Sequence, residues 1–170
     1  MTGFVALLRA VNVGGRKLLM SDLKAIATKI GFTAPRTFIA SGNLIFRSEA
    51  GEQALKRKLE AALERHMDAA VPVMIRSAQE LAEVAAANPF KSAPANRVAA
   101  IFLDQPPPKD AVAQAKNVLN ETIALGAREI FVHYPDGMGT SKLRIPAAAG
   151  GTARNMNSVA RLAELAKEQA

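Results

Sequence analysis

Hydrophobic and polar residues follow two different periods along the chain, and the period predicts the type of each element. A nearly unbroken apolar run over residues 3–9 is typical of a strand that is covered on both faces. Apolar residues then recur at helical spacing, at Leu23, Ile26, Ala27 and Ile30. Ser21 is placed to cap this helix and Gly31 to end it. A strand followed by a helix is therefore expected.

A hairpin, a second helix and a further strand are predicted next. Two β-type runs, residues 36–40 and 44–47, flank the turn-forming string Ser41-Gly42-Asn43. Leucines at every fourth position predict a helix over residues 52–66, and residues 71–75 form another β-type run. The order βαββαβ is that of the ferredoxin-like, split-βαβ arrangement.

This topology makes a prediction about two loops. In such a sheet the first two strands run parallel with the third strand between them. The loop leaving the first strand, residues 12–17, and the turn at residues 41–43 should then lie at the same edge of the sheet. We expect these two segments to be neighbours although they are distant in sequence.

The second half of the chain predicts a similar but less regular series. The expected elements are a helix over residues 77–87 capped by Ser77, a strand over 97–103, a helix from Pro108 to about Val118, a hairpin of 121–125 with 128–134, and a terminal helix. The order αβαββα predicts a second ferredoxin-like half that lacks its final strand. We expect an α+β protein of two ferredoxin-like halves, residues 1–76 and 77–170, packed into one compact unit. Its sheets should be mainly antiparallel, with helices on one face.

Composition narrows the class of protein. The chain has 170 residues and no cysteine, which excludes disulfides, thiol nucleophiles and thiolate metal sites. Its N-terminus lacks the basic segment of a signal peptide, and no apolar run approaches the roughly 18 residues of a membrane span. A soluble cytoplasmic protein without membrane contact is expected.

Positive charge is concentrated in the two glycine-rich regions. The net charge is +7, but residues 1–47 hold seven Lys and Arg against Asp22 alone, and residues 137–163 hold four cations and no acid. Such a field favours phosphate, carboxylate or nucleic-acid partners. The alternative is that these charged side chains only form a solvated face of the protein.

The candidate ligand-binding residues lie in the same regions. They are hydrogen-bond donors or loop glycines, namely Arg9, Asn12, Gly14, Gly15, Lys17, Ser41, Gly42, Asn43, Lys142, Arg154 and Asn155. Structural roles are the alternative for each group: the glycines permit a tight loop, residues 41–43 form an ordinary turn, and Arg154 and Asn155 cap and dock the last helix. The set includes no obvious general base.

Catalytic and metal motifs are weak. Neither His66 nor His133 has the spacing of a dyad or a metal site, and residues 137–142 lack the order of a phosphate-binding P-loop. We nominate no catalytic residue, no cofactor and no metal ligand. Phe4 and Phe46 fall on strands that RNA-binding sheets use for stacking, but residues 44–46 are more typical of a core.

Several strings, in order along the whole chain, resemble those of a bacterial family, the domain-of-unknown-function family numbered 1697. They are residues 7–15, 20–23, 31–32, 37–43, 134–137, 141–143 and 152–155. The resemblance implies the two-part ferredoxin-like fold and no established activity. This chain departs from the family pattern at Met156, where a Trp is usual, and in the short segment 143–151, where a longer helical stretch is usual.

Three classes of function remain open. The first is binding of a small anionic or phosphate-bearing ligand by residues 12–17 and 41–43. The second is weak, sequence-independent binding of nucleic acid by the basic faces. The third is an enzyme of unknown reaction that uses the Arg, Lys and Asn cluster. A homodimer through an exposed sheet edge is also compatible with the sequence.

Overall fold

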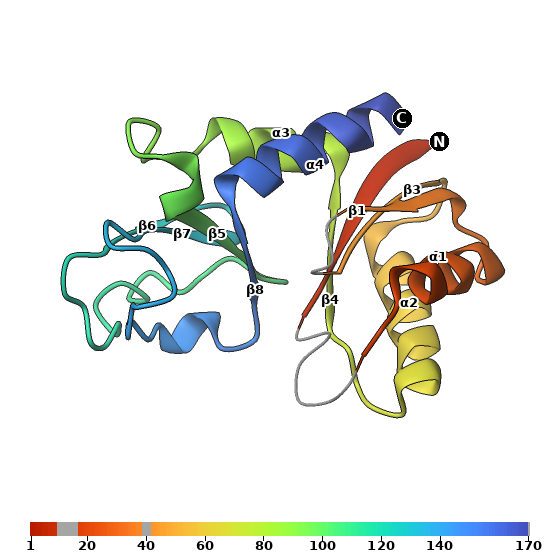
Figure 1. The fold of residues 1–170 in the computed structure, drawn as a ribbon, viewed down its shortest axis with the longest axis horizontal. Coiled ribbons are helices and arrows are strands. Elements are labelled where there is room, and N and C mark those ends of the chain that lie inside the picture. Colours follow the sequence, from red (N-terminus) through yellow and green to blue (C-terminus); the bar gives the residue numbers. More distant parts are fainter. Residues whose placement is uncertain (10–16, 39–41, 170) are drawn as a thin grey trace. The chain divides into compact units, whose positions relative to one another are not determined.

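The computed structural model describes residues 1–9, 17–38 and 42–169, which divide into two units (Figure 1). The first unit comprises Met1–Leu81 and Leu162–Ala170, and the second comprises Ala82–Arg161. The elements are β1 (Thr2–Leu8), α1 (Met20–Lys29), β2 (Thr33–Thr37), β3 (Asn43–Ser48), α2 (Glu52–Met67), β4 (Val73–Ser77), α3 (Ala78–Ala86), β5 (Val98–Phe102), β6 (Thr122–Leu125), β7 (Glu129–His133), β8 (Thr152–Asn155) and α4 (Met156–Gln169). Short 3-10 helices occupy Ala95–Arg97 and Pro146–Ala148.

The first unit contains an antiparallel sheet of order β2-β3-β1-β4. Helices α1 and α2 lie side by side against one face of this sheet (Figure 1). The core between them comes from alternate sheet residues, such as Phe4, Ala6 and Leu8, and from the leucine stripe of α2. This strand order is that of the ferredoxin-like arrangement, so the prediction for this half is confirmed.

The aromatic residues of the first sheet belong to its core. Phe46 is fully buried and stacks on Phe32, with ring centroids 4.1 Å apart, and on Phe4 at 5.8 Å. All three side chains pack in the cluster that α1 and α2 cover. The prediction that residues 44–46 are core is confirmed, and these rings offer no surface on which a base could stack.

Helix α1 ends as predicted but does not begin as predicted. Gly31 has φ +94°, its N–H donates to the Thr28 carbonyl at 3.1 Å, and the Phe32 N–H donates to the Ala27 carbonyl at 3.0 Å. This pair of bonds is the Schellman motif, which glycine favours. The prediction that Ser21 caps the helix is wrong, because the N-cap is Leu19 and Ser21 lies in the first turn, exposed.

The second unit repeats the strand order of the first, as β6-β7-β5-β8. The prediction that this half lacks its final strand is wrong, since Thr152–Asn155 forms β8 and pairs with β5. This strand has four residues and no apolar alternation, so its identity depends on pairing with β5 and not on a local pattern. Together the two sheets give the α+β, two-part ferredoxin-like fold.

The predicted helix from Pro108 to about Val118 is also wrong. Residues 109–114 form turns, and Lys116 then pairs with Arg144 in an isolated antiparallel bridge. Ala111 is buried, but Val112 and Val118 are 42% and 47% exposed. Without an apolar stripe to bury, a helix here would gain little from packing.

Candidate functional site

The end of β1 and the turn between β2 and β3 meet at one edge of the first sheet. The Leu8 N–H donates to the Gly42 carbonyl at 2.9 Å, and the register of β1 and β3 sets Leu7 opposite Asn43. The Arg9 N–H donates to the Pro72 carbonyl at 2.9 Å, which ties Arg9 to the residue that precedes β4. We call this region, with Arg9, Gly42 and Asn43, the β1 corner.

Asn43 has a structural role in the β1 corner. It is fully buried, and its Nδ2 donates to the Phe38 carbonyl at 2.9 Å while the Phe38 N–H donates to the Asn43 carbonyl at 3.2 Å. Gly42 has φ +83°, a left-handed conformation that a side chain would strain. These two residues shape the turn with their own groups, and the burial of Asn43 fits a structural role better than a surface ligand contact.

The remaining predicted residues of the first half fall into two classes. Arg9 is half-buried and Lys17 is exposed. Asn12, Gly14, Gly15 and Ser41 lie outside the described residues.

The three predicted residues of the second unit have different environments. Lys142 is exposed. Asn155 caps α4, since its Oδ1 accepts from the Ser158 N–H at 2.9 Å. Arg154 is buried, and its Nη1 donates to the Thr152 hydroxyl at 2.8 Å and to the Ala153 carbonyl at 2.9 Å.

Burial has a measurable consequence for Arg154. It lowers the pKa of the guanidinium to about 10, because burial penalises the charged form. The group is still charged at neutral pH. Its burial and its bonds to Thr152 and Ala153 fit a structural role on the second sheet better than a surface anion contact.

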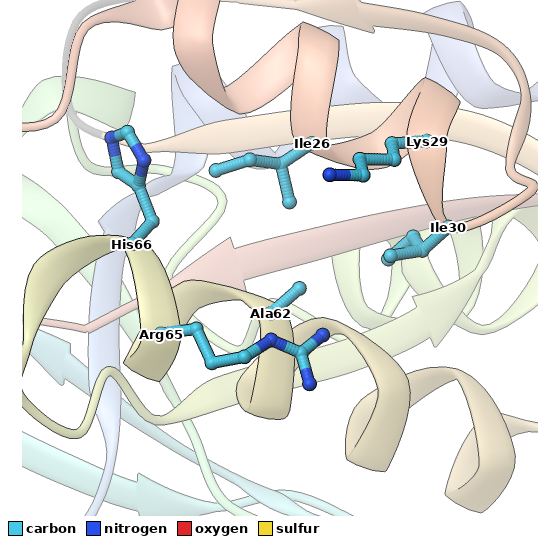
Figure 2. Close-up of a pocket in the computed structure, with 6 residues that line it drawn as sticks. All are labelled: Ile26, Lys29, Ile30, Ala62, Arg65 and His66. Atoms are coloured by element: carbon cyan, nitrogen blue, oxygen red, sulfur yellow. The ribbon is translucent and has the colours of Figure 1, made fainter.

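A groove between α1 and α2 also offers positive charge, and the sequence analysis did not single it out. Figure 2 shows Ile26, Lys29 and Ile30 on the α1 side facing Ala62, Arg65 and His66 of α2. Its volume is about 510 Å³, within the range of small-molecule sites. The sequence feature that could have indicated this groove is Ala62, a small residue on the leucine-rich face of α2.

The cations of this groove have an explanation in helix structure. Lys29 lies in the last turn of α1, and Arg65 and His66 lie in the last turn of α2, where the helix dipole favours positive charge. His66 also lies near an acid, with its Nε2 3.7 Å from Asp22 Oδ2. In addition to the β1 corner, this groove is a second region of the first unit where cations could hold an anion.

Metal and membrane sites find no support in the part of the chain that the structure describes. No group of three or more His, Asp or Glu side chains there could hold a metal ion. Within the same residues, no helix combines the length and the apolar character needed to cross a bilayer.

Comparison with known proteins gives the family and the fold. A solved structure, that of the conserved bacterial protein SP0830 from Streptococcus pneumoniae, is similar over 98% of this chain and 99% of its own, with a TM-score of 0.81 and 24% sequence identity. At that identity the likeness shows the fold alone. No curated protein matches the chain. The family model described as protein of unknown function (DUF1697) matches residues 1–131, and the chain therefore belongs to that family.

Proposed function

We propose that this protein binds a small anionic or phosphate-bearing ligand at the β1 corner. The observation that carries the proposal is the bond from the Leu8 N–H to the Gly42 carbonyl, 2.9 Å long. It joins the end of β1, four residues before the segment 12–17, to Gly42 of the segment 41–43, the two segments that the sequence singled out. A ligand held there would contact both segments at once.

The charge of the neighbouring chain supports an anion in this place. Residues 1–47 contain seven Lys and Arg and a single acid, Asp22. That acid lies 3.7 Å from the His66 imidazole, on the side of the sheet where α1 and α2 pack. Arg9 precedes the first segment and Lys17 ends it, and both side chains are at least partly accessible. Arginine binds phosphate and carboxylate with two parallel hydrogen bonds, which suits it to this role.

Direct measurement of anion binding tests the proposal. The protein purified from its own host is examined by native mass spectrometry for a co-purifying anion, and inorganic phosphate and pyrophosphate are titrated by calorimetry at low salt. Replacing Arg9 by Gln should weaken binding about ten- to a hundredfold, because a hydrogen bond to a charged group contributes about 1.5–3 kcal/mol. Lys17→Gln should weaken it less, since lysine binds as a single point charge.

Arg65→Gln is the matched control, because it removes one arginine charge from the α1–α2 groove and leaves the β1 corner unchanged. It should not alter the affinity. Loss of binding in Arg65→Gln together with full binding in Arg9→Gln would move the site to the groove. Absence of any bound anion in the wild-type protein would reject the proposal.

A further inference from the structure

We propose that a pocket beside Lys116 and Arg144 binds a phosphate monoester with an apolar organic part. The pocket is lined by Lys116, Arg144, Ile145, Pro146 and Ala149, and its volume is about 380 Å³. It belongs to the second unit, whereas the β1 corner belongs to the first. The inference is therefore independent of the proposed function.

The backbone holds the two cations side by side. The Lys116 N–H donates to the Arg144 carbonyl at 2.7 Å, and the Arg144 N–H donates to the Lys116 carbonyl at 2.9 Å. Residues that exchange both bonds across an antiparallel bridge carry their side chains on the same side, with Cβ atoms about 5.5 Å apart. The ammonium and the guanidinium therefore start from neighbouring points and can converge on one ligand.

Two like charges directly opposite each other destabilise a β pair. Over residues 1–9, 17–38 and 42–169, neither side chain makes an ion pair or a side-chain hydrogen bond that would offset this repulsion. Both residues are exposed, and Lys142 adds a third exposed cation two positions before Arg144. A dianion between Lys116 and Arg144 would convert the repulsion into two attractive contacts.

The rest of the pocket is apolar. Ile145 is buried, and Pro146 with Ala149 frames the short 3-10 helix that follows it. Among the residues that the structure describes, no acid lines the pocket. Two cations together with an aliphatic lining match a molecule that carries both a phosphate and an apolar group. Arg144 would take two phosphate oxygens and Lys116 a third.

Phenyl phosphate is the probe, and inorganic phosphate is its comparison. We expect titration of ¹⁵N-labelled protein to shift the backbone amides of Lys116, Arg144 and Ile145. The phenyl ester should bind at least tenfold more tightly than inorganic phosphate, because only the ester can bury apolar surface. Lys116→Gln and Arg144→Gln should each weaken binding at least tenfold, and Lys91→Gln, an exposed lysine of the same unit outside the pocket lining, should leave it unchanged.

Arg144→Glu separates loss of the site from loss of the fold. It places opposite charges across the bridge, so the melting temperature should rise or stay constant while phenyl phosphate binding disappears. Ala149→Leu should reduce the affinity for phenyl phosphate to that for inorganic phosphate, because the larger side chain would fill the space that the phenyl group occupies. The proposal is overturned if the wild-type protein shows no shift at these amides, if the ester binds no more tightly than phosphate, or if Lys91→Gln weakens binding as much as Arg144→Gln.

Discussion

Arg76 and Arg154 occupy equivalent positions in the two sheets. Each is the penultimate residue of the fourth strand of its sheet, β4 or β8, and each is buried. In both, Nη1 donates to the carbonyl of the preceding residue, Ile75 at 3.1 Å and Ala153 at 2.9 Å. The next residue, Ser77 or Asn155, caps the following helix. In both units, therefore, a strand carries a buried arginine at its penultimate position, and the residue after it caps the next helix.

The first prediction concerns the two helix caps, Ser77 and Asn155. Ser77 and Glu80 form a capping box, with the Glu80 N–H donating to Ser77 Oγ at 3.1 Å and the Ser77 N–H donating to Glu80 Oε1 at 2.9 Å. Ser77→Ala and Asn155→Ala should each lower the free energy of unfolding by about 1 kcal/mol, because each leaves a first-turn N–H without its acceptor. Urea denaturation followed by circular dichroism measures this loss.

Ser21→Ala is the control for the caps. Ser21 lies within the first turn of α1, and the side chain of the N-cap residue, Leu19, forms no capping hydrogen bond. Alanine has the higher helix propensity, so this variant should be neutral or more stable by up to about 0.5 kcal/mol. A loss of about 1 kcal/mol in Ser21→Ala would contradict the assignment of Leu19 as the N-cap.

A polar clamp between α2 and β4 gives the second prediction. Glu60 Oε2 accepts from the Val73 N–H at 2.9 Å and from Lys56 Nζ at 3.0 Å, and Lys56 Nζ also donates to the Val73 carbonyl at 2.5 Å. Glu60→Ala should destabilise the protein by about 1–3 kcal/mol, since the Val73 N–H loses its acceptor in a partly buried site. Glu64→Ala, an exposed glutamate one turn later, should cost under about 0.5 kcal/mol. Equal losses of unfolding free energy in both variants, measured by urea denaturation, would contradict a stabilising role for the hydrogen bonds of Glu60.

Two adjacent glycines give the third prediction. A Cβ on Gly151 would lie 2.7 Å from the Phe102 carbonyl oxygen and 2.9 Å from side-chain carbons of Ile101 and Leu103, whereas a Cβ on Gly150 would meet nothing within 4 Å. Gly151→Ala should therefore lower the melting temperature, at a cost of about 1–3 kcal/mol, because the backbone of β5 must shift. Gly150→Ala should be neutral or stabilising by up to about 1 kcal/mol. Differential scanning calorimetry of the two variants compares them directly, and similar melting temperatures would refute the close approach at Gly151.

The fourth prediction concerns pH. Burial raises the pKa of Tyr134 above its ordinary value of 10.0, and the negative charge of Glu121 raises it further. The chain has one tyrosine and no tryptophan, so absorbance at alkaline pH reports this phenol alone. Its titration midpoint should lie above pH 10 in the folded protein and near 10 in urea.

The sign of the stability effect follows from that shift. Below pH 10 the phenol is protonated in both states, and the unfolding free energy does not depend on it. As the pH rises from 10 through the folded pKa, the phenol of the unfolded chain ionises first, so the contribution of Tyr134 to stability falls. Glu121→Gln should lower the folded midpoint only part of the way towards 10, because burial is the larger cause. A midpoint at or below 10 in the folded wild-type protein would contradict the burial of Tyr134.

Much of the fold follows from local sequence. The leucine stripe of α2, the glycine that ends α1 and the capping box of α3 were predictable because their causes lie within one or two helical turns. The same holds for the hairpin of β6 and β7, which has β-type runs on both sides of Gly126. Charge and glycine content pointed to the region of the proposed anion site, and the edge contact of Leu8 with Gly42 follows from the strand order.

Tertiary contacts decided the rest. Thr152–Asn155 is a strand because β5 offers it an edge, and residues 109–114 are turns because no sheet face takes up an apolar stripe there. The pairing of Lys116 with Arg144, and the approach of Lys29 to Arg65 and His66, join residues that no sequence spacing connects. By itself the sequence determined the periodic elements and their order, because hydrophobic period and capping act over a few residues. Only the tertiary structure decided which charges meet and which short segments become strands, because both depend on partners supplied by distant parts of the chain.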